Sequence, residues 1–348
     1  MPASPRRATL ATVAASAGVS VATVSKVLNG RSDVAPATRS LVESLLREHD
    51  YMAPSPRRGP AANGAVAMCT VEVQFDSDLN AYSTEIVQGV VSAGAELGVG
   101  VVVSVRKTVD HPASWARDLV AAGRRALIAV TCEQLNDRQL RALSRVQLPL
   151  VVIDPLNLQH DQVTSIGSTN FAGGLAATQH LLSLGHRRIA YIGGPATATC
   201  NQARLHGYRA AMEAEGVPVP PGYTRFGRFR YQDGMDHGAA VLDLPEPPTA
   251  IFAGCDEVAL GVMEAARARG LRVPEDLSIV GFDDTQIARM TSPPLTTVRQ
   301  PLREMGGVAL RTALRLADGE KIDSHHVELA TELIVRASAA DVACAEHA

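Results

Sequence analysis

Residues 9–30 read TLATVAASAGVSVATVSKVLNG and give the clearest structural signal in the chain. Apolar residues recur at helical spacing from Leu10 to Ala17, and Gly18 follows as a left-handed helix stop. Ser20 can cap a second helix, which Asn29 ends. The stretch therefore predicts two short helices joined by a three-residue Gly-Val-Ser turn, at positions 10–17 and 21–28.

A third helix and a linker follow this pair. Pro36 suits the first turn of a helix that runs to about Asp50, with an apolar stripe made by Leu41, Val42, Leu45 and Leu46. Residues 52–63 then contain three prolines and cannot propagate an ordinary helix. The sequence thus predicts a small all-α helix-turn-helix headpiece over 1–51 and a Pro/Arg-rich hinge linker over 52–63.

Beyond the linker, apolar runs alternate with helical patterns, which predicts parallel sheets covered by helices on both faces. A first set has strands at 66–73, 99–105, 126–130 and 150–153 and helices at 83–97, 113–122 and 136–145. A second set has strands at 188–193, 250–253 and 277–282 and helices at 172–183, 203–215, 232–242 and 257–268. Two α/β lobes over 64–338 imply a ligand cleft at the carboxyl ends of their strands, and 339–348 are expected to form a disordered tail.

Charge and cysteine usage narrow the class of protein. Residues 1–60 hold eight Lys or Arg against four acidic residues, whereas the whole chain carries a net charge of −3. A basic N-terminal unit on an acidic body is typical of a phosphate-binding head. The five cysteines are widely spaced without metal-ligand patterns, so neither disulfides, a metal nor a cofactor is expected. With no signal peptide or membrane-length apolar run, we expect a cytoplasmic protein.

The segment 9–30 closely resembles the headpiece of the lactose-repressor (LacI/GalR) family, in which A-G-V-S-x-x-T-V-S-[RK]-V-L-N-G spans the turn and the recognition helix. Four later segments resemble the sugar-sensing domain of that family, which is related in fold to periplasmic binding proteins: 163–195, 204–216, 248–285 and 292–306. The resemblance implies a bacterial transcriptional regulator, a repressor and not an enzyme, whose affinity for a specific operator is controlled by a small molecule, a sugar.

The second helix can lie in the major groove with its N-terminal side chains on base edges. Lys26 can donate to guanine, and apolar side chains can contact thymine methyl groups. The expected base contacts are Val21, Ala22, Ser25 and Lys26. The resemblance places phosphate contacts at Thr9, Ser20, Thr23 and Asn29, which would set register rather than sequence preference.

The hinge departs from the family pattern Y-x-P-N-x-x-A-R-x-L. Here Tyr51 is followed by MAPSPRRGP, without the leucine that the family inserts into the minor groove. Arg57 and Arg58 either occupy a narrow minor groove as basic side chains or belong to a solvated linker.

The resemblance assigns effector binding first to Arg204 and Asp283, because a guanidinium donates to hydroxyl groups and a carboxylate accepts from them. A surface salt bridge is the alternative for either residue. Asp256 matches a further family position, although Cys255 replaces the usual polar residue before it. Ranked below these are residues that either contact a sugar or belong to the core: Asn80, Tyr82, Phe171 and Phe229.

The expected assembly is a homodimer formed through the sensor domain and bound to a pseudo-palindromic operator in double-stranded DNA. The tail after Ala337 has no leucine heptad that would indicate a tetramer. A solute-binding protein for a transporter is the rival from another class, and a nucleotide-linked enzyme is a more distant third because no phosphate loop is present. The sequence leaves open the identity of the effector and whether it releases DNA or promotes binding.

Overall fold

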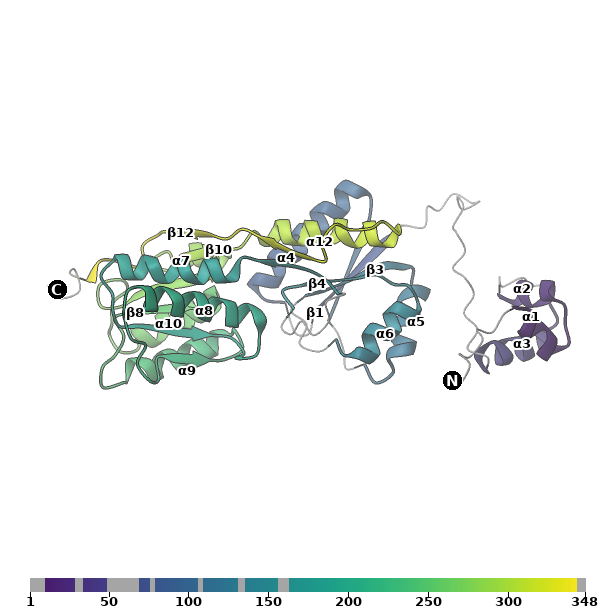
Figure 1. Cartoon of the computed structure of the whole chain (residues 1–348), viewed down its shortest axis with the longest axis horizontal. Helices are drawn as coiled ribbons and strands as arrows, with labels where there is room; N and C mark the ends of the chain where they lie inside the picture. Colours follow the sequence, from purple (N-terminus) through teal and green to yellow (C-terminus); the bar gives the residue numbers. More distant parts are fainter. Residues whose placement is uncertain are drawn as a thin grey trace. The chain divides into compact units, whose positions relative to one another are not determined.

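The computed structural model describes residues 10–28, 34–48, 69–75, 79–105, 109–130, 135–155 and 163–342. The chain divides into two compact units, the headpiece (1–67) and the α/β unit (68–348), each drawn in Figure 1. The predicted linker at 52–63 lies outside the described residues. Within those residues, every helix is too short or too polar to cross a membrane.

The headpiece has three helices, α1 Leu10–Ala17, α2 Val21–Leu28 and α3 Pro36–Glu48, as the sequence predicts. Gly18 has a φ of 63°, the left-handed conformation that ends α1. The Ser20 side chain accepts a hydrogen bond from the Thr23 backbone N–H at 3.1 Å and caps α2. Leu41 is 49% exposed, so its expected place in the apolar stripe is wrong. The buried core consists of Val13, Ala14, Val24, Val27 and Val42.

Lobe 1 of the α/β unit is built on a six-stranded sheet in the order β11-β5-β4-β3-β1-β2. Alternate residues of β1, namely Val71, Val73 and Phe75, pack against α4 and α12, because successive side chains point to opposite faces. A smaller core under α5 and α6 covers the other face. The elements are β1 Thr70–Phe75, α4 Ala81–Leu97, β2 Gly100–Val105, α5 Pro112–Ala121, β3 Arg124–Val130, α6 Asp137–Arg145, β4 Leu150–Ile153, β5 Thr164–Ser168, α12 Leu302–Ala317 and β11 His326–Leu329.

Lobe 2 has a second six-stranded sheet in the order β12-β10-β9-β8-β6-β7, with one apolar core on each face. All its neighbouring strands are parallel except β12, which runs antiparallel to β10. The elements are α7 Asn170–Ser183, β6 Ile189–Gly193, α8 Thr199–Ala214, β7 Thr224–Phe226, α9 Tyr231–Leu242, β8 Ala250–Ala253, α10 Asp256–Arg267, β9 Ser278–Asp283, α11 Gln286–Met290, β10 Thr296–Arg299 and β12 Glu332–Ile334.

The chain crosses between the lobes three times, after β5, after β10 and after β11. Figure 1 shows the result: α12, near the C-terminus, lies beside α4 on the lobe that the chain forms first. The crossovers are joined by hydrogen bonds, since the Thr169 and Thr331 hydroxyls lie 3.0 Å apart. The two predicted sets followed one another along the chain, so the return to lobe 1 and the elements β5, β7, α11, β10, α12, β11 and β12 were not predicted.

The predicted disordered tail from residue 339 onward is wrong for residues 339–342. His186 Nε2 lies 3.1 Å from the Ala340 carbonyl oxygen, and the Ala340 N–H donates to Ser278 Oγ at 3.0 Å. The Val342 N–H donates to the Leu184 carbonyl at 2.9 Å. Residues 343–348 lie outside the described residues.

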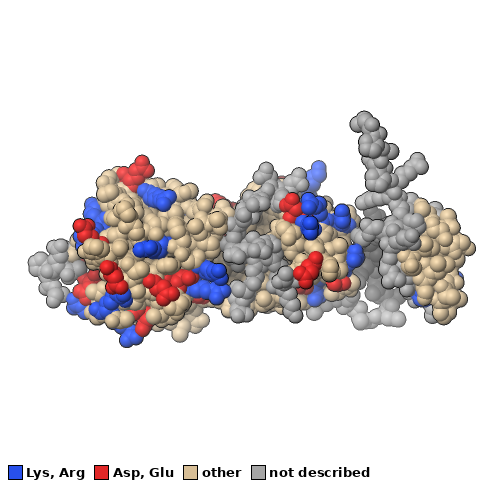
Figure 2. Space-filling model, turned by 90° about the horizontal axis from the view of Figure 1, so that it is seen from below, with Lys and Arg blue, Asp and Glu red and all other residues tan. Residues whose placement is uncertain are grey.

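Acidic and basic side chains are intermingled over the face of the α/β unit that Figure 2 shows. The net negative charge of this part of the chain is therefore spread over that face instead of forming one acidic patch. Specific recognition by the α/β unit has to come from a shaped site.

Candidate effector-binding site and recognition helix

A cavity of about 870 Å³ lies between the two lobes. Lobe 1 lines it with residues that follow β1 and β4, and lobe 2 lines it with residues that follow β6, β8 and β9. These are the carboxyl ends of parallel strands, where α/β folds bind ligands. The lining comprises Phe75, Leu79, Asn80, Ala81, Tyr82, Ser83, Asp154, Pro195, Cys200, Arg204, residues 227–232, Cys255, Asp256, Glu257, Asp283 and Thr285.

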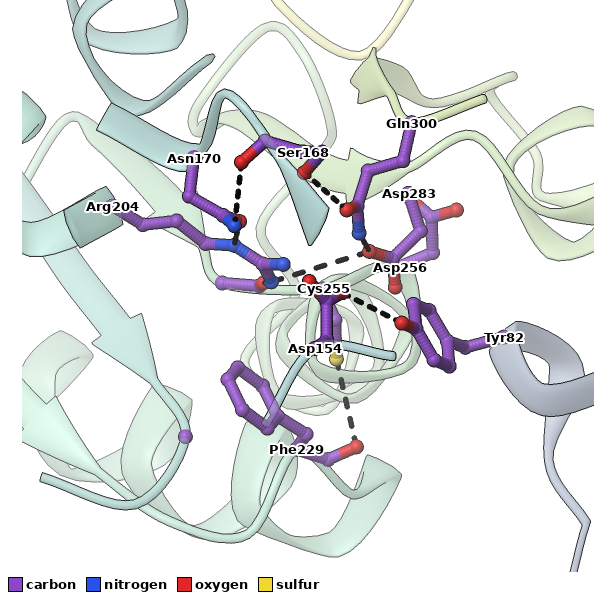
Figure 3. A network of polar contacts seen from close by, with 12 residues as sticks. Tyr82, Asp154, Ser168, Asn170, Arg204, Phe229, Cys255, Asp256, Asp283 and Gln300 are labelled. Atoms are coloured by element: carbon purple, nitrogen blue, oxygen red, sulfur yellow. Dashed lines mark hydrogen bonds and ion pairs between the residues drawn. The ribbon is translucent and has the colours of Figure 1, made fainter. Parts of the chain in front are cut away.

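The Arg204 side chain extends from α8 and is buried in lobe 2, where several groups of the protein contact it. Gly174 of α7 permits this placement, because a Cβ atom there would lie 2.3 Å from the Arg204 carbonyl oxygen. Arg204 Nε donates to Asn170 Oδ1 at 2.7 Å and Nη1 donates to the Gly254 carbonyl at 2.6 Å. Its guanidinium carbon lies 3.8 Å from the centre of the Phe282 ring. The buried side chain is thus fixed before any ligand arrives (Figure 3).

Asp283 ends β9 and lies beside this guanidinium, with 4.0 Å between its Oδ1 and Arg204 Nη1. Gln300 Nε2 donates to the same Oδ1 at 2.7 Å, and Gln300 Oε1 accepts from Ser168 Oγ at 2.5 Å. Burial raises the pKa of Asp283 well above its usual range, and Arg204 opposes this shift. Because Ser168 and Gln300 adjoin two of the crossovers, the network in Figure 3 connects the cavity to the segments that join the lobes.

The lobe 1 side of the cavity carries the polar pair Tyr82–Asp154 and, beside it, Asn80 and Ser83. The Tyr82 hydroxyl donates to Asp154 Oδ2 at 2.6 Å. Tyr82 is placed by the start of α4, where Asn80 Oδ1 accepts from the Ser83 N–H at 2.9 Å and caps the helix. Burial raises the pKa of Asp154, and the hydrogen bond from Tyr82 opposes this shift. The pair thus presents a phenol and a carboxylate to the cavity (Figure 3).

Both carboxylate oxygens of Asp256 accept hydrogen bonds from other residues of the protein. Its Oδ2 accepts from the Thr285 N–H at 2.7 Å and from the Thr285 hydroxyl at 2.9 Å, and its Oδ1 accepts from the Thr297 hydroxyl at 2.6 Å. Burial raises the pKa of Asp256 to about 7 although these hydrogen bonds oppose the shift. The neighbouring Cys255 thiol donates to the Phe229 carbonyl at 3.5 Å. Asp256 therefore holds the cavity wall together and has little capacity left for a ligand.

Of the two phenylalanines considered, only Phe229 lines the cavity. Its ring packs on Gly194, where a Cβ atom would lie 2.1 Å from the ring. Phe171 is 47% exposed on α7 and is absent from the cavity wall, so the structure does not bring it to the site. Its neighbour Asn170 faces Arg204, and adjacent helical residues point roughly 100° apart.

The sequence analysis missed several residues of the cavity. Asp154 is the most important, and it directly follows the apolar strand LVVI, a position that marks a ligand-facing carboxylate in parallel sheets. Cys200 is also in the wall, and burial raises the pKa of its thiol to about 11, so the thiol is protonated and unreactive at neutral pH. Other missed residues are Ser83, Thr285, Glu257 and, apart from Phe229, the segment 227–232.

Three of the four expected base-reading side chains of α2 are exposed on the headpiece. Val21 is 46% exposed, Ala22 and Lys26 are exposed, and Ser25 is half-buried. Thr23 is half-buried, and its hydroxyl lies 2.9 Å from that of Ser20. The other expected DNA-contacting residues, Thr9, Asn29, Arg57 and Arg58, lie outside the described residues.

Family models match parts of both units of the chain. Residues 9–54 match the model of bacterial regulatory proteins of the lacI family, and residues 178–339 match a periplasmic binding protein-like domain. The HTH-type transcriptional regulator DegA of Bacillus subtilis is 34% identical over 95% of this chain and 98% of its own.

Solved structures agree with these matches. A complex of the transcriptional regulator CelR with cellobiose superposes with a TM-score of 0.72 at 32% identity, covering 95% of this chain and all of that one. A lac repressor dimer bound to operator and an anti-inducer superposes at 0.68 with 28% identity, covering 96% of this chain and all of that one. These relatives are regulators and not enzymes. The chain belongs to the lacI family of bacterial transcriptional regulators.

Proposed function

We propose that this regulator represses transcription as a homodimer on a pseudo-palindromic operator, and that a saccharide in the interlobe cavity controls its affinity for that operator. One observation carries the effector class: Arg204 and Asp283 lie side by side in the cavity wall as donor and acceptor. Vicinal hydroxyl groups of a sugar accept from the first and donate to the second. The cellobiose complex of CelR and the operator-bound lac repressor dimer support the proposal.

The opposite wall would complete the site. Tyr82 and Asp154 offer hydrogen bonds to the other face of the sugar, Asn80 offers its amide N–H groups, and Phe229 offers an apolar ring face. Asp256 acts through Thr285 and not on the ligand. Phe171 has no place in this proposal.

A sugar held by both lobes favours one arrangement of the lobes over another, which is a population shift between two states. The hydrogen bonds from Asp283 through Gln300 to Ser168 are a physical route from the ligand to two crossovers. We infer that these crossovers are the segments that adjust when the ligand binds.

In the headpiece, α2 would lie in the major groove. The exposure of Val21, Ala22 and Lys26 supports base contacts by these residues, with Ser25 beside them. Ser20 and Thr23 at the start of α2, with Thr9 and Asn29, would bind phosphates, and Arg57 and Arg58 would follow the DNA from the hinge. A cytoplasmic location follows from the proposed target.

The decisive experiment selects DNA that binds the full chain from a random pool and then titrates the complex with saccharides, read by fluorescence anisotropy. At least one saccharide should change operator affinity, and Lys26→Ala should weaken binding to the selected DNA more than to random DNA. Analytical ultracentrifugation should give a dimer. Specific DNA binding that no saccharide alters would contradict the effector class, while equal losses on both DNAs would assign Lys26 to phosphate.

A further inference from the structure

The cavity has an outer end whose residues, apart from Phe229, have no role in the site described above. The outer loop is defined here as Gly227–Gln232, the connection from β7 to α9 together with the first two residues of α9, and every one of its residues lines the cavity. Arg228, Arg230, Tyr231 and Gln232 are exposed, whereas Arg204 and Asp283 at the inner end are buried. The cavity thus runs from an enclosed polar end to an open end rich in arginine and aromatic side chains.

The outer loop is held in one shape by Asp233. A single carboxylate oxygen of Asp233 accepts from the Arg228 N–H at 2.6 Å and from the Arg230 N–H at 2.9 Å. Phe229, between these two residues, has a φ of 60°, a conformation that non-glycine residues adopt at an energetic cost. The cost is met by these bonds and by the Gly227 N–H, which donates to the Gly193 carbonyl at 2.9 Å. The rim of the cavity is therefore preorganised.

Lobe 1 contributes apolar surface to the same mouth. Leu79 lines the cavity and is 48% exposed, and Tyr231 from the outer loop is 37% exposed. Both lobes contribute here, since Ala81 at the start of α4 and Glu257 in the first turn of α10 line the same cavity. An aromatic ring and an apolar side chain beside arginine donors suit a sugar ring, which has apolar faces and a hydroxyl edge.

The cavity is also larger than a single sugar unit needs. Its 870 Å³ lie near the top of the range of roughly 300–1,000 Å³ found for sites that enclose drug-sized ligands, whereas a single pyranose is smaller than such ligands. A monosaccharide held at Arg204 and Asp283 would leave the outer end filled with water.

We propose that the outer loop forms a second sugar subsite, that the effector is an oligosaccharide of at least two units, and that Asp233 is the positioning residue of this subsite. The inference rests on the proposed saccharide effector and deepens it. The inner unit binds Arg204 and Asp283, and the next unit packs on Tyr231 and Leu79 while Arg228 and Arg230 donate to its hydroxyl groups. Asp233 touches no ligand atom and acts through the backbone of the loop.

The test measures the affinity of the full chain for cellobiose, xylobiose and lactose and for the monosaccharides glucose, xylose and galactose, by calorimetry. The best disaccharide should bind at least about ten-fold more tightly than either of its units. Tyr231→Ala should remove most of that ratio and leave monosaccharide affinity unchanged. Asp233→Ala should also remove most of the ratio, with a smaller loss of monosaccharide affinity because Phe229 stands on the same loop. Asp233→Asn, which keeps an acceptor oxygen, should retain much of the ratio. Asp243→Ala is the matched control, because it removes a carboxylate at the far end of α9, paired there with Arg269.

The outcomes separate this inference from the proposed function. If monosaccharides bind as tightly as disaccharides, the saccharide effector stands and the second subsite is wrong. If Asp233→Ala and Tyr231→Ala lower the affinity for both ligand sizes equally, the loop supports the whole cavity and the positioning role is wrong. If none of the six sugars binds the unmodified chain, the proposed saccharide effector itself fails. Should Asp233→Ala not fold, the exposed Tyr231→Ala still decides the question.

Discussion

The two walls of the cavity are built differently. In lobe 2, Arg204 and Asp283 are tied by hydrogen bonds to Asn170, Gly254 and Gln300 and are buried without a ligand. In lobe 1, Tyr82 and Asp154 share one hydrogen bond, and the bonds between Asn80 and Ser83 are local to the cap of α4. The ligand-facing side chains of lobe 2 are thus held in place by a hydrogen-bond network, whereas those of lobe 1 have fewer contacts that fix them. Truncating a hydrogen-bonded side chain in lobe 2 should therefore reduce both stability and effector affinity, and changes in lobe 1 should reduce mainly affinity.

The largest effect is expected for Arg204→Ala. Removing the guanidinium leaves Asn170 Oδ1 and the Gly254 carbonyl buried without their donor and leaves Asp283 without its neighbouring positive charge, which should lower the free energy of unfolding by about 3–5 kcal/mol. Effector affinity should fall by about a hundred-fold or more. Urea denaturation and effector titration measure the two losses. Arg209→Ala, an exposed arginine on the same helix, should change neither. If the two variants unfold at the same urea concentration, the network around Arg204 does not stabilise lobe 2, and the contrast between the lobes is wrong.

Asp283→Asn separates affinity from stability within lobe 2. The amide keeps an oxygen for Gln300 but weakens the acceptor for effector hydroxyls, so effector affinity should fall roughly ten- to a hundred-fold while operator binding without effector stays intact. The control is Asp284→Asn next to it, which breaks ion pairs with Arg299 at 2.8 Å and Arg336 at 2.5 Å. That control should lose stability and keep its effector affinity. The reverse pattern would place the ligand elsewhere in the cavity.

Tyr82→Phe tests whether the polar side chains of lobe 1 contribute mainly to effector affinity. Loss of one hydroxyl should weaken effector binding by about five- to ten-fold and change the free energy of unfolding by less than about 1 kcal/mol. Tyr223→Phe is the matched control, because its hydroxyl donates to the Glu246 carbonyl at 2.6 Å away from the cavity wall. It should leave effector affinity unchanged. A stability loss in Tyr82→Phe as large as in Arg204→Ala would remove the distinction between the walls.

The smallest expected effect is a pH dependence of stability caused by Asp256, which holds part of the lobe 2 wall. The pKa of Asp256 rises from 3.8 to about 7 on folding, so the folded chain holds a proton that the unfolded chain has already lost. The stabilisation is fully present below about pH 4 and is lost as the pH rises through 7; between about pH 6 and 8 the free energy of unfolding should fall by roughly 1 kcal/mol. Asp256→Asn should flatten this slope in urea titrations. Asp276→Asn should leave it unchanged, because a hydrogen bond from Arg272 already lowers the pKa of Asp276 to about 2.

Local patterns in the sequence predicted the parts of the fold that depend on local chemistry. The cap at Ser20, the stop at Gly18 and the strands at 150–153 and 250–253 follow from residue type and spacing. The crossovers could not be predicted in this way, because β11 and β12 are short strands whose partners are set by contacts far along the chain. Leu41 shows the same limit, since helical spacing alone does not tell which edge of an apolar stripe is covered.

The site was predictable to a similar extent. Arg204 and Asp283 were expected together, and the structure brings them to within 4.0 Å. Asp154 was accessible from its place after a strand but was overlooked. Gln300 and the outer loop apart from Phe229 had no signal in the sequence, because their roles depend on which segments the fold brings next to Asp283 and Gly193.

The crossovers also govern the order in which the protein can be completed during synthesis. Lobe 1 begins to leave the ribosome first, yet its core requires Met305, Ala309 and Leu310 of α12, all of which are fully buried against strands that begin at Thr70. A nascent chain that ends at Arg299 has five strands of lobe 1 and the main strands of lobe 2, but the apolar face of β1 still lacks one of its two covering helices. Such uncovered strands attract chaperones and other chains. The part made first is thus committed to its final form only when nearly the whole polypeptide has been made.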